Sequence, residues 1–264
     1  MSKKFEIVFV PLGYDKKYQI SVKGHSFNVM FRSLDTYDNI DDLEYEFFDD
    51  FAYSHENYSF LLKELSKLVS GSVLEVGAGT GNLTKNLLVN PNISKLDIIE
   101  PDENLINKFK QKFTIPIKKA DGIKYKVKVK YDYIISSFVY HHIPDSDKFK
   151  FLENQYSHIK NRGKIIIGDT FILPYLNKQE RDNSFRLYYN SRIKNMKNDF
   201  FKMLMKICLD KSLKRTDEWK TSSEFLINQL KIVGFNNINV KDIGNQTYGG
   251  DKIIIAEKYI ELSY

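Results

Sequence analysis

The stretch VLEVGAGTGNLT, residues 73–84, is the most informative part of the chain. An apolar run reaches an acid, Glu75, and glycines then stand at every second position: Gly77, Gly79 and Gly81. Glycines let a backbone turn sharply and lie flat against a ligand, because they carry no Cβ. We expect a buried strand over 72–77 and a helix over 82–89. The first N–H groups of that helix, near Asn82, would face a bound cofactor.

Strands and helices alternate on both sides of this turn. The predicted strands are 72–77, 95–100, 115–120, 131–138, 163–169, 235–243 and 252–259. The predicted helices are 54–69, 82–89, 102–113, 145–160 and 221–234. Such alternation indicates crossover connections, a parallel sheet and helices on both of its faces. The turn-rich GNQTYGGD joins the last two strands, so the last strand should run antiparallel to its neighbour.

Several side chains predict where these helices start and stop. Asp102 should cap the helix over 102–113, and Ser222 or Ser223 the helix over 221–234. Gly234 should end that last helix, because glycine readily takes a left-handed conformation.

Two regions extend the predicted sheet domain. Strands over 3–10 and 17–31 predict a β-hairpin or small sheet, so residues 1–50 are interpreted as an N-terminal unit and 51–264 as the main domain. A long helical insertion over 171–220 could form a cap above the ligand pocket, although plain helical packing is the alternative.

Charge is unevenly distributed along the chain, whose net charge is +6. Residues 34–56 carry nine acids and no Lys or Arg, whereas residues 178–220 carry twelve Lys or Arg and six acids. The basic segment fits either a solvated helical face or a nucleic-acid footprint. The acidic segment fits a solvated loop, a contact with the basic cap or a surface that attracts a cationic amine.

Composition narrows the class of protein. A hydrophobic share of 42% can fill a core, and one cysteine, Cys208, excludes an intrachain disulfide. The start MSKKFEIVFVPLG is too short and too interrupted for a signal peptide. No stretch approaches the roughly 18 apolar residues of a membrane span. We therefore expect a soluble, cytoplasmic protein without a membrane partner.

The glycine pattern resembles a known motif. A dinucleotide fingerprint, G-x-G-x-x-G, would place its third glycine at position 82, where Asn82 stands. The observed acid-x-Gly-x-Gly-x-Gly instead resembles the first motif of class I S-adenosylmethionine-dependent methyltransferases. The resemblance extends in order along residues 48–170. It implies a Rossmann-like, seven-stranded, mostly parallel sheet and S-adenosylmethionine as the cofactor.

The resemblance also implies which residues hold that cofactor. Glu100, at the end of the strand over 95–100, would accept hydrogen bonds from the ribose hydroxyls, and Glu75 could attract the ammonium group. The turn KKADG would contact adenine, and the strand YDYIISSF would line the cofactor. An aromatic residue of FFDDFAYSHENY would cover it. The remaining residues assigned by the resemblance are Tyr53, Asp121, Gly122, Ser136 and Ser137.

The motif VYHHIPD implies candidates for proton transfer beside the substrate entrance. His141 and His142 follow the predicted strand over 131–138, and histidine is the usual general base near neutral pH. Some small-molecule members of the family use the second of these positions, so His142 is favoured over His141. Packing or hydrogen bonding is the alternative role for both. No metal is expected.

Three functions are compatible with these features. The favoured one is methyl transfer to an N or O atom of a small-molecule acceptor, and the tetrapeptide NPPY of many base-methylating enzymes is absent. An RNA- or protein-modifying methyltransferase is the second, supported by the basic segment 178–220. In the third, a non-catalytic partner protein uses the N-terminal hairpin as a dimer or partner edge. A homodimer is left open, and a nucleic-acid partner is not favoured.

Overall fold

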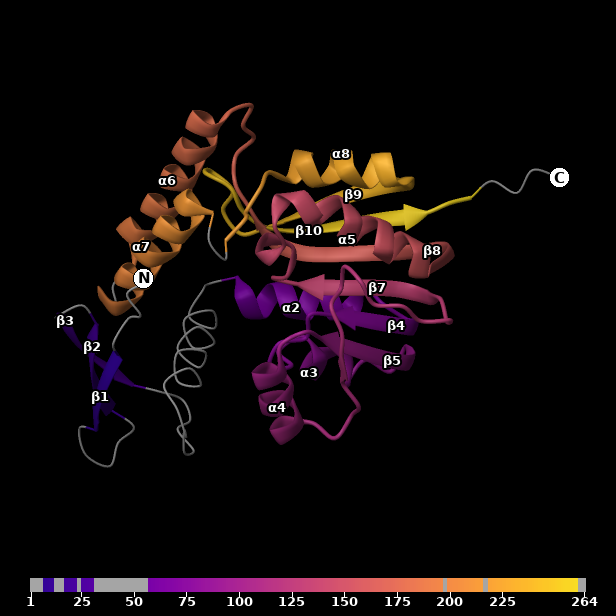
Figure 1. Ribbon diagram of the computed structural model, residues 1–264, viewed down its shortest axis with the longest axis horizontal. Coiled ribbons are helices and arrows are strands. Elements are labelled where there is room, and N and C mark those ends of the chain that lie inside the picture. The colour runs from indigo at the N-terminus through magenta and orange to yellow at the C-terminus, as the bar shows by residue number, and fades with distance from the viewer. Residues whose placement is uncertain are drawn as a thin grey trace.

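The structure, a computed structural model, describes residues 7–11, 17–22, 25–30, 57–196, 199–215 and 218–260. At its centre lies a seven-stranded sheet in the order β6-β5-β4-β7-β8-β10-β9 (Figure 1). The strands are β4 (Gly71–Val76), β5 (Ile93–Glu100), β6 (Lys118–Lys119), β7 (Tyr131–Ser137), β8 (Ile159–Phe171), β9 (Phe235–Ile243) and β10 (Gly250–Lys258). The five neighbouring strands β6, β5, β4, β7 and β8 are parallel, and β10 is antiparallel to β8 and β9. The predicted mostly parallel sheet with an antiparallel last strand is confirmed.

Helices cover both faces of this sheet (Figure 1). One face carries α2 (Tyr58–Lys67), α3 (Thr84–Leu87) and α4 (Glu103–Lys112), and the other carries α5 (Asp145–His158) and α8 (Ser223–Val233). Consecutive side chains of the central strand β7 pack into hydrophobic cores on opposite faces of the sheet. Ile134 packs in the core that includes α5 and α8, and Ile135 packs in the core that includes α2 and α3. This burial on both sides explains the continuous apolar runs of the sequence.

The predicted helix ends are confirmed where the structure records their hydrogen bonds. The side chain of Asp102 accepts hydrogen bonds from the backbone N–H groups of Asn104 (2.7 Å) and Leu105 (3.1 Å). Ser222, rather than Ser223, caps α8 by accepting from the N–H of Phe225 at 3.2 Å. Gly234 ends α8 in the left-handed conformation, with φ of 110°.

Two elements are much shorter than the sequence predicts. The helix expected over 82–89 has only the four residues of α3. The glycine turn occupies the first residues of the expected helix. After α3, the side chain of Asn90 donates to the carbonyl oxygens of Ser66 and Val69, which holds the chain there in a non-helical path. The strand expected over 115–120 has only the two residues of β6, since it lies at the sheet edge and pairs with β5 alone.

The N-terminal strands form a separate three-stranded antiparallel sheet. Its strands are β1 (Ile7–Pro11), β2 (Lys17–Val22) and β3 (His25–Met30), so the single strand expected over 17–31 is two. The predicted domain boundary at residue 50 and the whole acidic segment 34–56 lie outside the described residues.

Two helices follow β8 before the chain returns to the sheet. These helices, α6 (Lys178–Asn195) and α7 (Asp199–Lys214), lie beyond the carboxyl ends of the parallel strands (Figure 1, orange). They form a hydrophobic cluster of their own, which contains Ile172, Phe185, Tyr188, Tyr189, Met205 and Cys208. We call α6 and α7 the cap helices. In the part of the chain that the structure describes, no helix is long and apolar enough to cross a membrane.

Candidate active site

The glycine turn lies between β4 and α3, as the sequence predicts. Gly77, Gly79 and Gly81 all have positive φ, at 72°, 56° and 92°. A Cβ at Gly77 would lie 2.5 Å from Cγ2 of Val139, and one at Gly81 would lie 2.3 Å from Cε2 of Phe113. Backbone conformation and neighbouring side chains therefore both exclude larger residues at these two positions.

Glu100 ends β5 beside this turn and is only 5% exposed. Its Oε2 accepts a hydrogen bond from the N–H of Gly79 at 2.8 Å, and its Oε1 accepts one from the N–H of Asp102 at 3.1 Å. Burial raises the pKa of Glu100, and these two N–H groups offset part of that effect. The carboxylate thus connects the glycine turn to the start of α4 and has lone pairs left for further donors.

Glu75 occupies a different environment from the one expected. It is buried beneath the turn, and Thr84 Oγ1 donates to its Oε2 at 2.6 Å. Burial raises its pKa to about 8. Among the described residues, Glu75 does not line the cavity that the turn borders. Its contacts therefore hold α3 against β4, and its attraction for a cofactor ammonium group stays a prediction.

The raised pKa of Glu75 predicts how stability depends on pH. The unfolded chain loses this proton near the ordinary value of 4.5, whereas the folded protein keeps it up to about 8. Between these values only the folded state holds the proton, so the free energy of unfolding falls as pH rises, by at most about 1.4 kcal/mol per pH unit. Glu75→Gln should remove this loss and raise Tm relative to the wild type at alkaline pH.

Thermal unfolding at about pH 5 and about pH 8 would test this expectation. Glu103→Gln provides the control, because Glu103 is a glutamate exposed on α4 and its replacement should leave the slope between the two pH values unchanged. Parallel pH profiles for wild type and Glu75→Gln would show that the carboxyl is ionised in the folded protein.

A cavity of about 490 Å³ extends from the glycine turn to the cap helices. Seven residues that the sequence analysis assigned to the site line it: Gly77, Gly79, Asn82, Glu100, Ser137, His141 and His142. The cap helices contribute Tyr188 and Tyr189 from α6 and Met205 and Cys208 from α7. The structure therefore brings the glycine turn, the histidine pair and the cap helices together around one cavity.

Other predicted site residues lie elsewhere. Asp121 accepts from the N–H of Ile123 at 2.8 Å, and the carbonyl of Gly122 accepts from Gln155 at 2.7 Å. Neither residue is among the described residues that line the cavity, nor is Ser136, which is buried within β7. Contacts of these three with a cofactor stay predictions. Tyr53 lies outside the described residues.

The histidine pair occupies the short helix η1 (Tyr140–His142), which follows β7. His141 is 8% exposed, and its Nδ1 lies 2.5 Å from Oδ1 of Asp169. The backbone N–H of His141 donates to the other carboxylate oxygen at 3.1 Å. Burial acts to raise the pKa of Asp169, but the charge of His141 and the hydrogen bonds together lower it. Asp169 therefore holds His141 in one orientation, with the His142 ring 4.0 Å away between centroids.

A segment between α7 and α8 completes this end of the cavity. Glu218 and Lys220 line the cavity and form an ion pair. Burial acts to raise the pKa of Glu218, but the charges of Lys220 and of both histidines lower it. The backbone N–H of Trp219 donates to the carbonyl oxygen of His141 at 2.7 Å, which ties this segment to η1.

Asp169, Glu218 and Lys220 were not predicted from the sequence. Asp169 carries a usable signal, because it is an acid near the end of a buried strand, like Glu100. Glu218 and Lys220 lie more than seventy residues after the histidines, and no local pattern connects the two segments.

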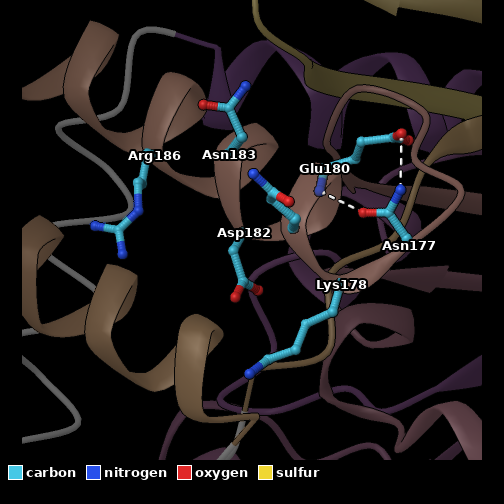
Figure 2. A pocket seen from close by; sticks show the side chains of 7 residues that line it. Asn177, Lys178, Glu180, Asp182, Asn183 and Arg186 are labelled. Atoms are coloured by element: carbon cyan, nitrogen blue, oxygen red, sulfur yellow. Dashed lines mark hydrogen bonds between the residues drawn. The ribbon is translucent and has the colours of Figure 1, made fainter.

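A second hollow lies on the surface at the start of α6 (Figure 2). Its lining consists of exposed or half-buried polar side chains of the first turns of that helix. Asn177 accepts from the N–H of Glu180 at 3.0 Å and donates to its carboxylate at 2.8 Å (Figure 2). These bonds cap the helix, and we assign no further role to the hollow.

The fold and the cavity define a class of protein. The sheet order, the antiparallel last strand and the glycine turn with its carboxylate are those of the Rossmann-like S-adenosylmethionine-dependent methyltransferases. The family described as methyltransferase domain matches residues 51–206. The chain belongs to this family and is an S-adenosylmethionine-dependent methyltransferase.

Individual relatives agree with this assignment. An uncharacterized methyltransferase of Bacillus cytotoxicus is 32% identical over 157 residues, which cover 57% of this chain and 70% of the relative. Human N-acetylserotonin methyltransferase in complex with S-adenosylmethionine has a similar fold, with a TM-score of 0.54, 20% identity and coverage of 81% of this chain and 55% of that one. The N-methyltransferase NodS of Bradyrhizobium japonicum, in complex with S-adenosylhomocysteine, also has a similar fold, with a TM-score of 0.52 and 15% identity. The match covers 77% of this chain and 89% of that one.

Proposed function

We propose that this methyltransferase acts on a nitrogen or oxygen atom of a small-molecule acceptor. The observation that carries the proposal is the cavity, which the glycine turn lines together with His141 and the cap tyrosines Tyr188 and Tyr189. Its volume of about 490 Å³ falls in the range of small-molecule sites. The fold neighbours named above include an N-methyltransferase, which is compatible with a nitrogen acceptor.

The glycine turn and Glu100 would hold the cofactor. The ribose hydroxyls would donate to Glu100, and the methyl group would point toward the histidine pair. The acceptor atom forms a bond to the methyl carbon while the electrons of the carbon–sulfur bond return to sulfur. Because the sulfonium carbon is already activated, the protein mainly supplies alignment and excludes water.

Removal of the acceptor's proton is assigned to the histidine pair. Sequence resemblance places His142 first, but the contacts of His141 support it more directly. A carboxylate at Nδ1 fixes the orientation of an imidazole and stabilises its charged form, which leaves Nε2 to take a proton. His142 lines the same cavity, so the two roles are separable by mutation.

Turnover with defined acceptors would test the proposed function. Purified protein would be incubated with methyl-labelled S-adenosylmethionine and with pools of amines, phenols and aliphatic alcohols, and separately with RNA and with protein. We expect release of S-adenosylhomocysteine and label in at least one small-molecule pool. Label in RNA or protein, with none in any small molecule, would replace this proposal with a macromolecular acceptor.

A further inference from the structure

Three side chains with metal-binding atoms meet at the acceptor end of the cavity. His141 and His142 come from η1, and Glu218 comes from the segment before α8. Their ligand atoms all lie within 4.8 Å of one another. All three residues also line the cavity, so an ion held between them would face a bound acceptor.

The contacts around this cluster hold its members in place. The hydrogen bond from Trp219 to the carbonyl of His141 fixes one backbone segment against the other. The bond between Nδ1 of His141 and Asp169 leaves Nε2 of His141 as its ligand atom. Metal-bound histidines usually have such a carboxylate at their second nitrogen, where it fixes the tautomer and increases the basicity of the ligand.

The charges at the cluster also favour a cation. Asp169 and Glu218 place two carboxyl groups at this cluster, one against His141 and one among the ligand atoms. Lys220 donates to one oxygen of Glu218 and neutralises one of the two negative charges. With both histidines neutral, as metal binding requires, one negative charge remains. Lys220 should weaken metal binding by competing for Glu218, without cancelling the site.

We propose that His141, His142 and Glu218 bind a divalent transition-metal ion of the zinc type. Two imidazole nitrogens and one carboxylate oxygen are a common ligand set of catalytic zinc, which keeps a fourth position for substrate. The inference rests on the proposed function, because it uses the same acceptor end of the cavity. It departs from the sequence analysis, which expected no metal.

Such an ion would change how the acceptor loses its proton. A hydroxyl bound at the fourth position would have a lowered pKa and would release its proton to water. Its oxygen would then form the bond to the methyl carbon, and the carbon–sulfur electron pair would return to sulfur. An ion at this site would therefore replace the proton-acceptor role proposed above for the histidine pair: both imidazoles would act as ligands, and water would take the proton.

Direct binding measurements test the site without relying on activity. Protein dialysed against a chelator would be titrated with Co²⁺, which absorbs visible light when bound at low coordination number, and with Zn²⁺ in competition. We expect one equivalent to bind, with affinity reduced about 100-fold or more in His142→Ala and Glu218→Gln. Asp169→Asn should reduce it about 10- to 100-fold. Glu224→Gln, at the exposed start of α8, is the matched control and should leave it unchanged.

The outcomes distinguish this inference from the proposed function. No uptake of Co²⁺, or uptake that His142→Ala leaves intact, would overturn the metal site, and His142 is exposed, so this variant should fold. Full turnover by chelator-treated protein would overturn the part proposed for the ion in proton removal, while supporting the proposed function. Stoichiometric binding that the variants abolish, together with no methylation of any small molecule, would support the metal site and contradict the proposed function.

Discussion

Glu100→Ala should weaken binding of S-adenosylmethionine by about 100-fold, or about 2.7 kcal/mol. Hydrogen bonds to an ionised group contribute about 1.5–3 kcal/mol each, and Glu100 is placed to accept two of them from a ribose. The substitution would also remove the bond that holds the N–H of Gly79 at 2.8 Å. Isothermal calorimetry with the cofactor and with S-adenosylhomocysteine would measure the loss.

Glu103→Ala is the matched control for this substitution. Glu103 lies three residues further along the chain, and its carboxylate pairs with Lys119 on the surface. Its removal should change the dissociation constant less than about twofold. A dissociation constant for Glu100→Ala within that range, in protein whose Tm matches the wild type, would show that the cofactor is not held by this carboxylate.

His141→Ala should lower kcat by about 10²- to 10⁴-fold, the usual contribution of a positioned proton acceptor. The dissociation constant of S-adenosylmethionine should stay within about twofold of the wild type, since Glu100 and the glycine turn are untouched. Asp169→Asn should also lower kcat, because an amide favours the wrong tautomer of the imidazole. Single-turnover rates with saturating cofactor would measure both effects.

His158→Gln provides the control for the loss of a histidine. His158 lies on α5, where it contacts Asn154 and stacks on Tyr125, and it does not line the cavity. The kcat of the His158→Gln variant should remain within about threefold of the wild-type value. His142→Ala, measured in parallel, would show which imidazole matters more. If both His141→Ala and His142→Ala retain near-normal kcat while binding cofactor normally, the histidine pair has no role in proton removal.

Much of the fold follows from patterns that are local in sequence. The strands of the sheet are apolar runs because both faces are buried, and this signal does not depend on distant residues. The antiparallel last strand follows from the short turn before it, and Asp102 and Gly234 mark helix ends through their own backbone chemistry. The glycine turn is equally local, since three positive φ values in close succession favour glycine at each position.

The features that the sequence left unpredicted depend on tertiary contacts. The short α3 ends where the amide of Asn90 reaches back to α2, a contact that no periodicity encodes. The resemblance assigns Asp121 to the adenine, and the structure adds a hydrogen bond within its own loop that no local pattern predicted, so the contact with the cofactor stays a prediction. Glu218, which follows the cap helices in the chain, meets the histidine pair of η1 although more than seventy residues separate them in sequence. Charge and burial at these sites are set by residues far apart in sequence.

The hydrogen bond from Trp219 to His141 has a consequence for substrate entry. It joins the segment between α7 and α8 to η1, which carries the histidine pair, so these two parts should move as one body. If the entrance opened by a movement of the whole insertion 171–220, the imidazole of His141 would be displaced at every turnover. We therefore expect the moving part of the entrance to lie earlier in the chain, on the side of α6 and α7 away from the bond between Trp219 and His141. Product could then leave while the histidine pair keeps its position.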